Sequence, residues 1–370
     1  MPGKDLFRKP FDEGTVVKLN VYRDYLKEWL PVFVSKKEPI WTTIQIFDFF
    51  AGQGKDMNNI SGSPLIAIEI VKSLEHFIKE RNITVILHFN ELDADNYSLL
   101  EESLAGIEGQ FVIKKYKQDF STLFLSLYDS MKSSANFLFL DQNGIKQITA
   151  DIFGKIISLK QTDFLFYISS SYFKRFATTP EFQKYFSFDT KEIQEMNYFH
   201  IHRNVLQHYK SLIPGNKKYY LAPFSIKKGS NIYGLIFGTN HTLGIEKFLT
   251  IAWKNDKLRG EANYDIDNES IDLKKPSLFE EFNKPNKRQI FEKNLTGNIL
   301  TKQLNNKHSV YLYSLNEGFL LKDANTVLSR LNTEKKIKFD FKLITSDLHK
   351  DKDNSKIILL YVVQQLNGQK

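Results

Sequence analysis

The stretch IFDFFAGQG, residues 46–54, holds the side chains and backbone groups best suited to binding a ligand. It begins as an apolar strand, and Asp48 stands where that strand ends. Gly52 and Gly54 have no Cβ, so the loop can turn tightly and a ligand can approach the backbone closely. Open α/β sheets bind nucleotides at the carboxyl ends of their strands. The stretch therefore predicts a cofactor pocket, with contacts from Asp48, Phe50, Ala51, Gly52 and Gly54.

A helix is predicted at Ser63–His76, a few residues after this loop. The pattern D-x-F-A-G-x-G followed by GSPLIAIE resembles motif I of the class I S-adenosylmethionine-dependent methyltransferases. The resemblance implies S-adenosylmethionine as the cofactor, and an acid after the second strand that grips the ribose diol. Glu91 stands at that place. After the third strand, Asp119 either accepts a hydrogen bond from the adenine amine or caps the helix beginning near Ser121.

Two further residues are candidates for orienting the methyl acceptor, and we take them as the predicted catalytic residues. Asp141 ends the fourth strand, where amino-methyltransferases place an acid or amide that accepts hydrogen bonds from the target amine. His241 lies near the end of a later strand and is either a general base or base-binding donor, or a turn residue without a role. The histidines show no metal-ligand spacing, and no metal site is expected.

These residues must be positioned by a sheet, and the chain alternates strand-like runs with helix-length connections. Such alternation predicts a parallel, doubly wound α/β sheet. Strands are expected at 44–50, 83–90, 111–116, 136–140 and 164–169, and a closing antiparallel hairpin at 218–224 and 232–238. That hairpin is what a class I methyltransferase-like sheet adds to a plain Rossmann order. An amphipathic helix at Thr15–Phe33 precedes the sheet.

Three parts are expected along the chain. Residues 1–255 form the Rossmann methyltransferase-like domain, with an inserted helical region at about 172–212. Residues 256–287 are polar, contain Pro276 and Pro285, and are predicted to be a linker. Residues 288–370 are predicted to form a smaller, basic winged-helix domain, because helices at 288–304 and 322–336 precede two strand-like runs at 337–343 and 357–363.

The 370-residue chain carries a formal net charge of +8, and the excess lies in its last part. From Lys274 onward, 18 Lys and Arg face 10 Asp and Glu, whereas residues 1–273 hold 33 of each. This asymmetry indicates a polyanion partner, either RNA or DNA. The alternative is that the lysines only solvate the surface. The predicted nucleic-acid contacts are Lys322, Arg330, Lys335 and Lys336.

Other features bear on the compartment and on redox chemistry. The chain has no cysteine, so it can supply neither a disulfide nor a thiolate ligand. No apolar run approaches the ~20 residues of a membrane helix. We expect a cytoplasmic protein that does not bind a membrane.

Several segments together resemble the three-Cys-motif partner proteins of bacteria. The markers are Thr15, Lys18 and Leu19 with Tyr25, Leu26 and Trp29; the motif I run; Phe139–Lys146; and Thr239–Lys247 with Trp253. The resemblance implies a methyltransferase-like body that works beside a second protein carrying a three-cysteine motif. Two positions depart from the family pattern: Gly14 stands where His is usual, and Gln142 stands where Pro is usual.

Two functions follow from these patterns. The first is a methyltransferase-like protein, dependent on S-adenosylmethionine, that acts on or senses nucleic acid. The second is a catalytically degenerate platform that binds a cofactor or nucleotide as a non-enzymatic subunit of a mobile-element or phage-defence module. In a third interpretation the C-terminal domain binds protein, with Val327, Leu328 and Leu331 buried.

Overall fold

The computed structural model describes residues 10–142, 147–169, 179, 198–229, 231–269, 285–341, 348–349 and 355–360. The chain divides into two compact units. The first unit comprises residues 1–256 and 261–266, and the second comprises 257–260 and 267–370. Most of the predicted insertion at 172–212 lies outside the described residues.

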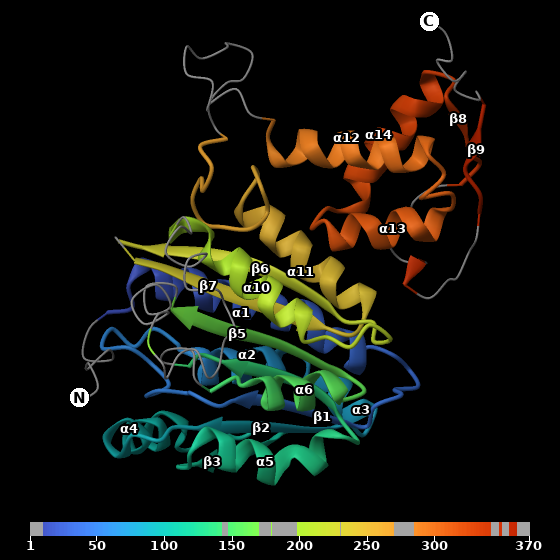
Figure 1. Cartoon of the computed structure of the whole chain (residues 1–370). Helices are drawn as coiled ribbons and strands as arrows, with labels where there is room; N and C mark the ends of the chain where they lie inside the picture. The colour runs from blue at the N-terminus through green and yellow to red at the C-terminus, as the bar shows by residue number, and fades with distance from the viewer. Residues whose placement is uncertain are drawn as a thin grey trace, which may run out of the picture. The chain divides into compact units, whose positions relative to one another are not determined.

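A seven-stranded sheet forms the centre of the first unit (Figure 1). Its order is β3-β2-β1-β4-β5-β7-β6, with β7 antiparallel to both of its neighbours and the other neighbouring strands parallel. The strands are β1 (Thr43–Asp48), β2 (Thr84–Asn90), β3 (Val112–Tyr116), β4 (Ala135–Leu140), β5 (Thr162–Ser169), β6 (Tyr220–Lys228) and β7 (Asn231–Thr239). The strand order reverses between β1 and β4, which is where doubly wound sheets bind ligands. The predicted α/β sheet with a closing antiparallel hairpin is confirmed.

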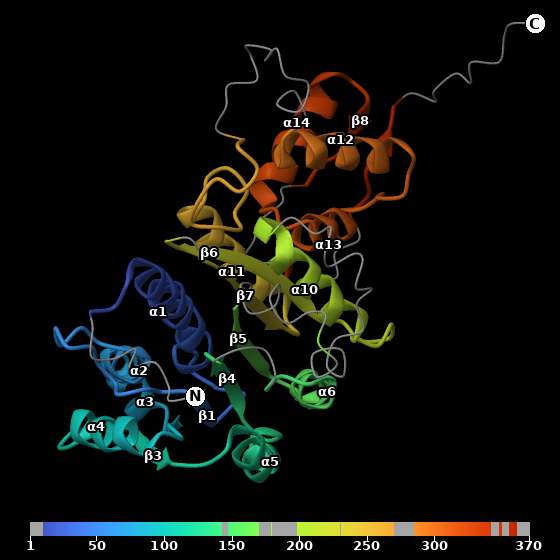
Figure 2. The ribbon, with the colours of Figure 1, turned by 60° about the vertical axis from the view of Figure 1, so that its left-hand side comes forward.

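Helices cover both faces of this sheet (Figure 2). The helices are α1 (Glu13–Val34), α2 (Ser63–Ser73), α3 (Glu75–Glu80), α4 (Ala94–Leu104), α5 (Phe120–Met131), α6 (Ala150–Ser158), α10 (Ile201–Ser211) and α11 (Thr242–Asn255), with a short 3-10 helix at Tyr198–His200. The predicted single helix at 63–76 is wrong at its end, because the chain leaves helical geometry at Leu74, where φ is −116°, and resumes at Glu75.

Helix α1 packs on the sheet through a stripe of aromatic side chains at helical spacing. Tyr22 lies 4.5 Å from Phe139 and Tyr25 lies 4.7 Å from Phe237, measured between ring centroids. Both tyrosines are fully buried. Asp12 caps the helix by accepting a hydrogen bond from the Thr15 amide. This packing fixes the first turns of α1 above the carboxyl edge of the sheet.

The opposite face is covered by α5, α6 and α10. Phe49, Phe120 and Phe124 pack together there, and Phe166 meets Tyr209 of α10 with ring centroids 4.8 Å apart.

A polar ladder also crosses the strands: Tyr116, His88, Gln45 and Ser134 are joined by side-chain hydrogen bonds of 2.7–2.9 Å. Nε2 of Gln45 donates to Ser134, so Oε1 of Gln45 accepts from Nε2 of His88, and Nδ1 of His88 accepts from the Tyr116 hydroxyl.

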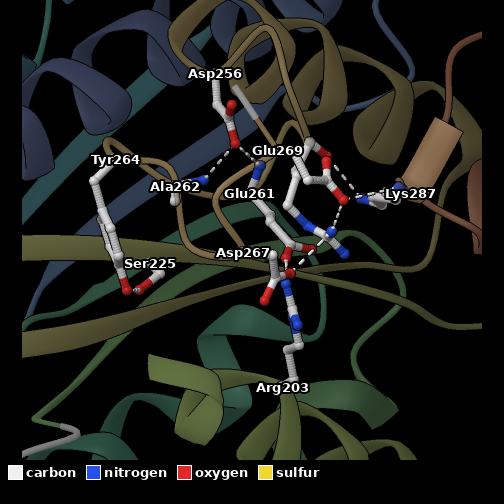
Figure 3. A network of polar contacts seen from close by, with 10 residues as sticks. Arg203, Ser225, Asp256, Glu261, Ala262, Tyr264, Asp267, Glu269 and Lys287 are labelled. Carbon is white, nitrogen blue, oxygen red and sulfur yellow. Dashed lines mark hydrogen bonds and ion pairs between the residues drawn. The ribbon is translucent and has the colours of Figure 1, made fainter. Parts of the chain in front are cut away.

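The edge strand β6 is covered by a short segment that follows α11. The Ser225 amide donates to the Glu261 carbonyl, and the Asn263 amide donates to the Ser225 carbonyl. Asp256 holds the segment by accepting hydrogen bonds from the amides of Glu261 and Ala262 (Figure 3). Part of the predicted linker is therefore an extra, parallel strand segment beside β6.

The second unit contains three helices and a small strand pair. The helices are α12 (Lys287–Leu300), α13 (Lys307–Asn316) and α14 (Leu321–Thr333), and β8 (Ile337–Lys338) pairs antiparallel with β9 (Ile358–Leu359). An isolated antiparallel bridge joins Asn306 to Lys356. Helix α13 is not among the elements predicted from the sequence. Within this unit Arg259 forms ion pairs with Asp267 and Glu269, and Lys287 Nζ donates to the Arg259 carbonyl.

None of the helices in the described ranges is long and apolar enough to span a membrane.

Candidate functional site

The loop after β1 is shaped by two glycines in the left-handed region. Gly52 has φ +62° and Gly54 has φ +83°, values that side chains rarely adopt. The Gly62 amide donates to the Gly54 carbonyl at 2.8 Å, and this hydrogen bond joins the two ends of the 55–61 segment that precedes α2. Asp56 stabilises this segment because its carboxylate accepts hydrogen bonds from the amides of Asn58 and Ile60. It also accepts one from the Phe11 amide.

The glycine loop is tied to the end of the neighbouring strand β2. The Ala51 amide donates to the Asn90 carbonyl at 2.9 Å, and the Gly52 amide donates to Oε2 of Glu91 at 3.0 Å. The other oxygen of Glu91 accepts from the Asp93 amide. Burial raises the pKa of Glu91, although these two amides favour its charged form. Glu91 therefore faces the β1–β2 crossover, as the sequence predicts for a cofactor-binding acid.

Asp48 is buried at the end of β1 with half of its carboxylate unpaired. Oδ1 accepts from the Phe50 amide at 3.2 Å, whereas Oδ2 has no hydrogen-bond partner. The buried hydroxyl of Tyr22 is also unpartnered, and the charge of Asp48 acts on it. Burial raises the pKa of Asp48 to about 7, against the opposing effects of the Ser63 hydroxyl, the Phe50 amide and Lys18. A buried polar atom without a partner is costly, so a ligand or water that supplies a donor would be favoured here.

Asp141 follows β4 and is paired with a lysine from α1. Lys18 Nζ contacts Oδ2 of Asp141 and lies 4.6 Å from the centroid of the Tyr167 ring. Lys18 is only 8% exposed. Tyr167 in turn stacks on Tyr233, with centroids 5.2 Å apart. The carboxyl edge thus carries Asp48, Glu91 and Asp141 at the ends of three strands, and one buried cation beside them.

His241 lies at the other edge of the sheet, so its predicted pairing with Asp141 at one acceptor site is wrong. Strand β7 is antiparallel, and its end therefore meets the start of β5: the Thr239 hydroxyl donates to Asp163 at 2.6 Å. His241 follows as the N-cap of α11, and its Nδ1 accepts from the Leu243 amide. Asp141, in contrast, follows the last residue of β4, which pairs with Phe166.

Three other predicted cofactor contacts have local roles. Asp119 is the N-cap of α5 and accepts from the Thr122 amide at 3.2 Å, which is the second of its two predicted roles. The half-buried Phe50 ring packs against Phe120 with centroids 5.4 Å apart. Ala51 is buried and contributes the amide that joins the loop to β2.

The four predicted nucleic-acid contacts are exposed in and after α14, but two of them are paired. Arg330 forms an ion pair with Glu292 at 3.0 Å and a hydrogen bond with Thr296. Lys336 pairs with Glu334 at 2.7 Å. In the described part of the chain no carboxylate pairs with Lys322 or Lys335.

Sequence reasoning missed two residues of this site as functional candidates. Asn90 joins three segments, because its side chain donates to the carbonyls of Phe49 and Gln118 and accepts from the Gln118 amide. Lys18 appeared only as a helix marker. A lysine within an apolar helical stripe was the available signal, since burial of an unpaired lysine is unfavourable. A Cβ at Gly14 would lie 2.8 Å from Cβ of Lys228, so this position has little room for a side chain.

No group of three or more His, Asp or Glu able to hold a metal ion occurs among the described residues.

Neither a protein-family model nor a curated protein matches this sequence. Solved structures do match. An O-methyltransferase from Bacillus cereus in complex with SAH is 11% identical, with a TM-score of 0.33, 61% of this chain covered and 86% of that chain. TomG from Streptomyces achromogenes, an O-methyltransferase of tomaymycin synthesis in complex with SAM, is 10% identical, with a TM-score of 0.33 and coverage of 62% and 90%. The DszA carbon methyltransferase is 10% identical, with a TM-score of 0.33 and coverage of 61% and 56%. Similarity this weak carries no argument, so the fold rests on the strand order itself.

Proposed function

We propose that the first unit binds S-adenosylmethionine at the carboxyl edge of β1 and β2 and transfers its methyl group to an acceptor. The observation that carries this proposal is the hydrogen bond between the Gly52 amide and Glu91, beside the half-satisfied carboxylate of Asp48. A carboxylate held there can accept both hydroxyl hydrogens of a ribose. The glycine loop lets the ligand approach the backbone, and Oδ2 of Asp48 can accept from the ligand's ammonium group.

When bound, the cofactor supplies an electrophilic methyl group on a positively charged sulfur. The contribution of the chain is positioning, which can account for a large part of a rate enhancement. Glu91 and the loop amides hold the adenosyl end, and Asp48 holds the amino group. Asp141 at the next strand end accepts a hydrogen bond from the acceptor and orients its lone pair.

Titration calorimetry of the purified full chain with S-adenosylmethionine tests the proposal. We expect micromolar binding that Glu91→Ala weakens by about tenfold or more, because charge-assisted hydrogen bonds are lost. The matched control is Glu102→Ala, which removes an exposed carboxylate on α4 and should leave the affinity unchanged. Absence of heat with the wild-type chain up to millimolar ligand would contradict cofactor binding.

A second candidate function is a platform that binds the cofactor without turning it over. Its specific support is that Lys18 already engages the carboxylate of Asp141, and that Gln142 follows where the family pattern has proline. Incubation with labelled S-adenosylmethionine and a mixture of RNA and duplex DNA separates the two functions. Transfer of label that Asp141→Ala abolishes supports the enzyme. Tight binding without transfer favours the platform.

For the second unit, the proposed ligand is nucleic acid. Its support is the positive charge from residue 274 onward and the exposed Lys322 and Lys335, in and just after α14, which have no carboxylate partner among the described residues. Three helices followed by an antiparallel strand pair are also the element order of a winged-helix module, the fold predicted for this unit. Protein binding is the competing role.

Association with a protein that carries a three-cysteine motif stays a prediction of the family resemblance. Its support is the set of sequence markers alone. Co-expression of the chain with a protein carrying such a motif, followed by affinity purification from either partner, tests it; failure to co-purify in both directions would count against it.

A further inference from the structure

Lys18 is the least expected charged group at the carboxyl edge. It comes from the second turn of α1, an otherwise apolar part of the helix, and its side chain is buried between Asp141 and the face of Tyr167. A lysine is almost never buried unless it is paired. Packing of α1 does not require this charge, because Tyr22, Tyr25 and Leu26 already anchor the helix.

The charges around Lys18 leave room for one further anion. Asp141 accepts one hydrogen bond from the Lys18 ammonium, and the Tyr167 ring lies against another side of the ammonium. An ammonium has three N–H donors, so one has no acceptor among the described residues and can serve a ligand. The neighbouring lysine, Lys228, is engaged by Asp12 at 2.6 Å. Among the described residues, Lys18 is therefore the cation best placed to receive an anion at the ends of β1 and β4.

The ends of β1 and β4 also provide the matching acceptor. Asp48 presents the unpartnered Oδ2, and its charge and that of Lys18 act on each other. A zwitterionic α-amino acid group needs one anion for its ammonium and one cation for its carboxylate. Asp48 and Lys18 supply this pair from β1 and α1.

We infer that Lys18 recognises the carboxylate of the methionyl group of the cofactor and thereby selects S-adenosylmethionine over analogues that lack it. The inference rests on the proposed function. Asp141 holds Lys18 in position. With ligand bound, Lys18 donates to the methionyl carboxylate, and the Asp141 carboxylate becomes available to the acceptor. Lys18 is a specificity-determining and positioning residue in this scheme.

The experiment compares S-adenosylmethionine with decarboxylated S-adenosylmethionine, which lacks only the carboxylate. Calorimetry of the full wild-type chain should give a preference of about tenfold or more for the carboxylated ligand. In Lys18→Met the preference should disappear or reverse, because the unpaired Asp141 attracts the more cationic analogue. Lys18→Arg keeps the charge and should retain part of the preference.

The matched control is Lys27→Met, which removes an exposed lysine from the same helix and should keep the wild-type preference. A wild-type chain that binds both ligands equally would overturn the role of Lys18 and leave cofactor binding intact. The same holds if folded Lys18→Met keeps the wild-type preference. A wild-type chain that binds neither ligand would instead refute the proposed function. Equal affinities of the wild-type chain for the two ligands would overturn the inference even if Lys18→Met fails to fold.

Discussion

Asp48 illustrates how a single buried side chain can lower stability. Its carboxylate is 1% exposed, and Oδ2 lacks a partner. Burial raises its pKa to about 7 from 3.8, so the folded chain binds more protons than the unfolded chain between these two values. Stability therefore falls as the pH rises through this window and stays reduced above it.

Replacing Asp48 by Asn should stabilise the chain at pH 8 and abolish cofactor binding. The neutral amide avoids the cost of a buried charge, while its oxygen can still accept from the Phe50 amide. We expect a gain on the order of 1–4 kcal/mol at pH 8 that shrinks toward pH 4. Urea denaturation at the two pH values measures it. Glu69→Gln, at an exposed position on α2, is the control. Equal stability of Asp48→Asn and wild type at pH 8 would show that the buried carboxylate carries no such cost.

Sequence reasoning succeeded for residues whose place is set by a parallel strand end and failed where direction or partner mattered. Asp48 is the last residue of β1, Glu91 and Asp141 follow β2 and β4, and all three lie at one edge of the sheet. His241 follows β7, and a hairpin pattern alone does not specify which of its two strands pairs antiparallel with β5. The role of Lys18 could not be predicted from its surroundings in the sequence, because it depends on a contact with Asp141, 123 positions away.

At the level of single elements, the glycine loop combines positive φ angles with a close approach to α4. Gly54→Ala would place a Cβ 3.1 Å from Cβ of Ser103 at a φ of +83°. Gly106 also has a positive φ, +70°, but a Cβ there would meet open space. Both alanine variants should lose about 1 kcal/mol of stability from backbone strain. Only Gly54→Ala should also weaken S-adenosylmethionine binding, because the loop amides are moved. Thermal unfolding and calorimetry on both variants measure the two effects, and equal affinities would argue against a ligand at this loop.

The polar ladder through β3, β2 and β1 predicts a separate pH dependence. Burial, followed by the charge of Lys114, lowers the pKa of His88 to about 3. As the pH falls below about 6.5, His88 becomes protonated in the unfolded chain but stays neutral in the folded chain. The free energy of unfolding therefore decreases below that pH. We expect a loss approaching 1.4 kcal/mol per pH unit between about 6 and 4 from this residue.

His88→Gln tests this dependence. The variant should be less stable than wild type at pH 7.5 by roughly 1–3 kcal/mol, because a glutamine cannot reach both Tyr116 and Gln45. Its stability should, however, fall less steeply below pH 6.5. His76→Gln, at an exposed site on α3, should keep the wild-type slope. An unchanged slope in His88→Gln would assign the acid sensitivity to other groups.

The elements themselves could largely be predicted, since strands β1 to β7 begin and end within a few residues of the expected positions. Apolar runs that end in Asp, Asn or Gly mark them clearly. The break at Leu74 and the helix α13 could not be predicted in the same way. The first has no Gly or Pro signal, and the second has apolar residues mixed with Lys, His and Ser.

On the scale of the whole molecule, the uneven charge predicts salt-dependent binding of nucleic acid by the chain. Exchanging both Lys322 and Lys335 for Glu should weaken binding to a duplex or a single strand and reduce the slope of log affinity against log salt by about 2. Lys72→Glu with Lys79→Glu makes the same charge change on exposed sites of the first unit, and should leave the slope unaltered. Fluorescence anisotropy across a salt series measures it. Binding that does not weaken with salt would favour protein as the partner of this unit.

The segment that covers β6 determines where the chain can be shortened. Residues 261–263 form hydrogen bonds with the backbone amide and carbonyl of Ser225 on the outer side of β6, and the Lys227 amide donates to the Asn263 side chain. A polypeptide that ends at residue 256 would leave the outer backbone groups of β6 unpaired and able to pair with another chain. A polypeptide that ends at residue 269 would keep the 261–263 segment that covers them. We expect the shorter product to self-associate and the longer one to stay monodisperse, which light scattering distinguishes. A monodisperse 1–256 product would mean that β6 is protected by some other device.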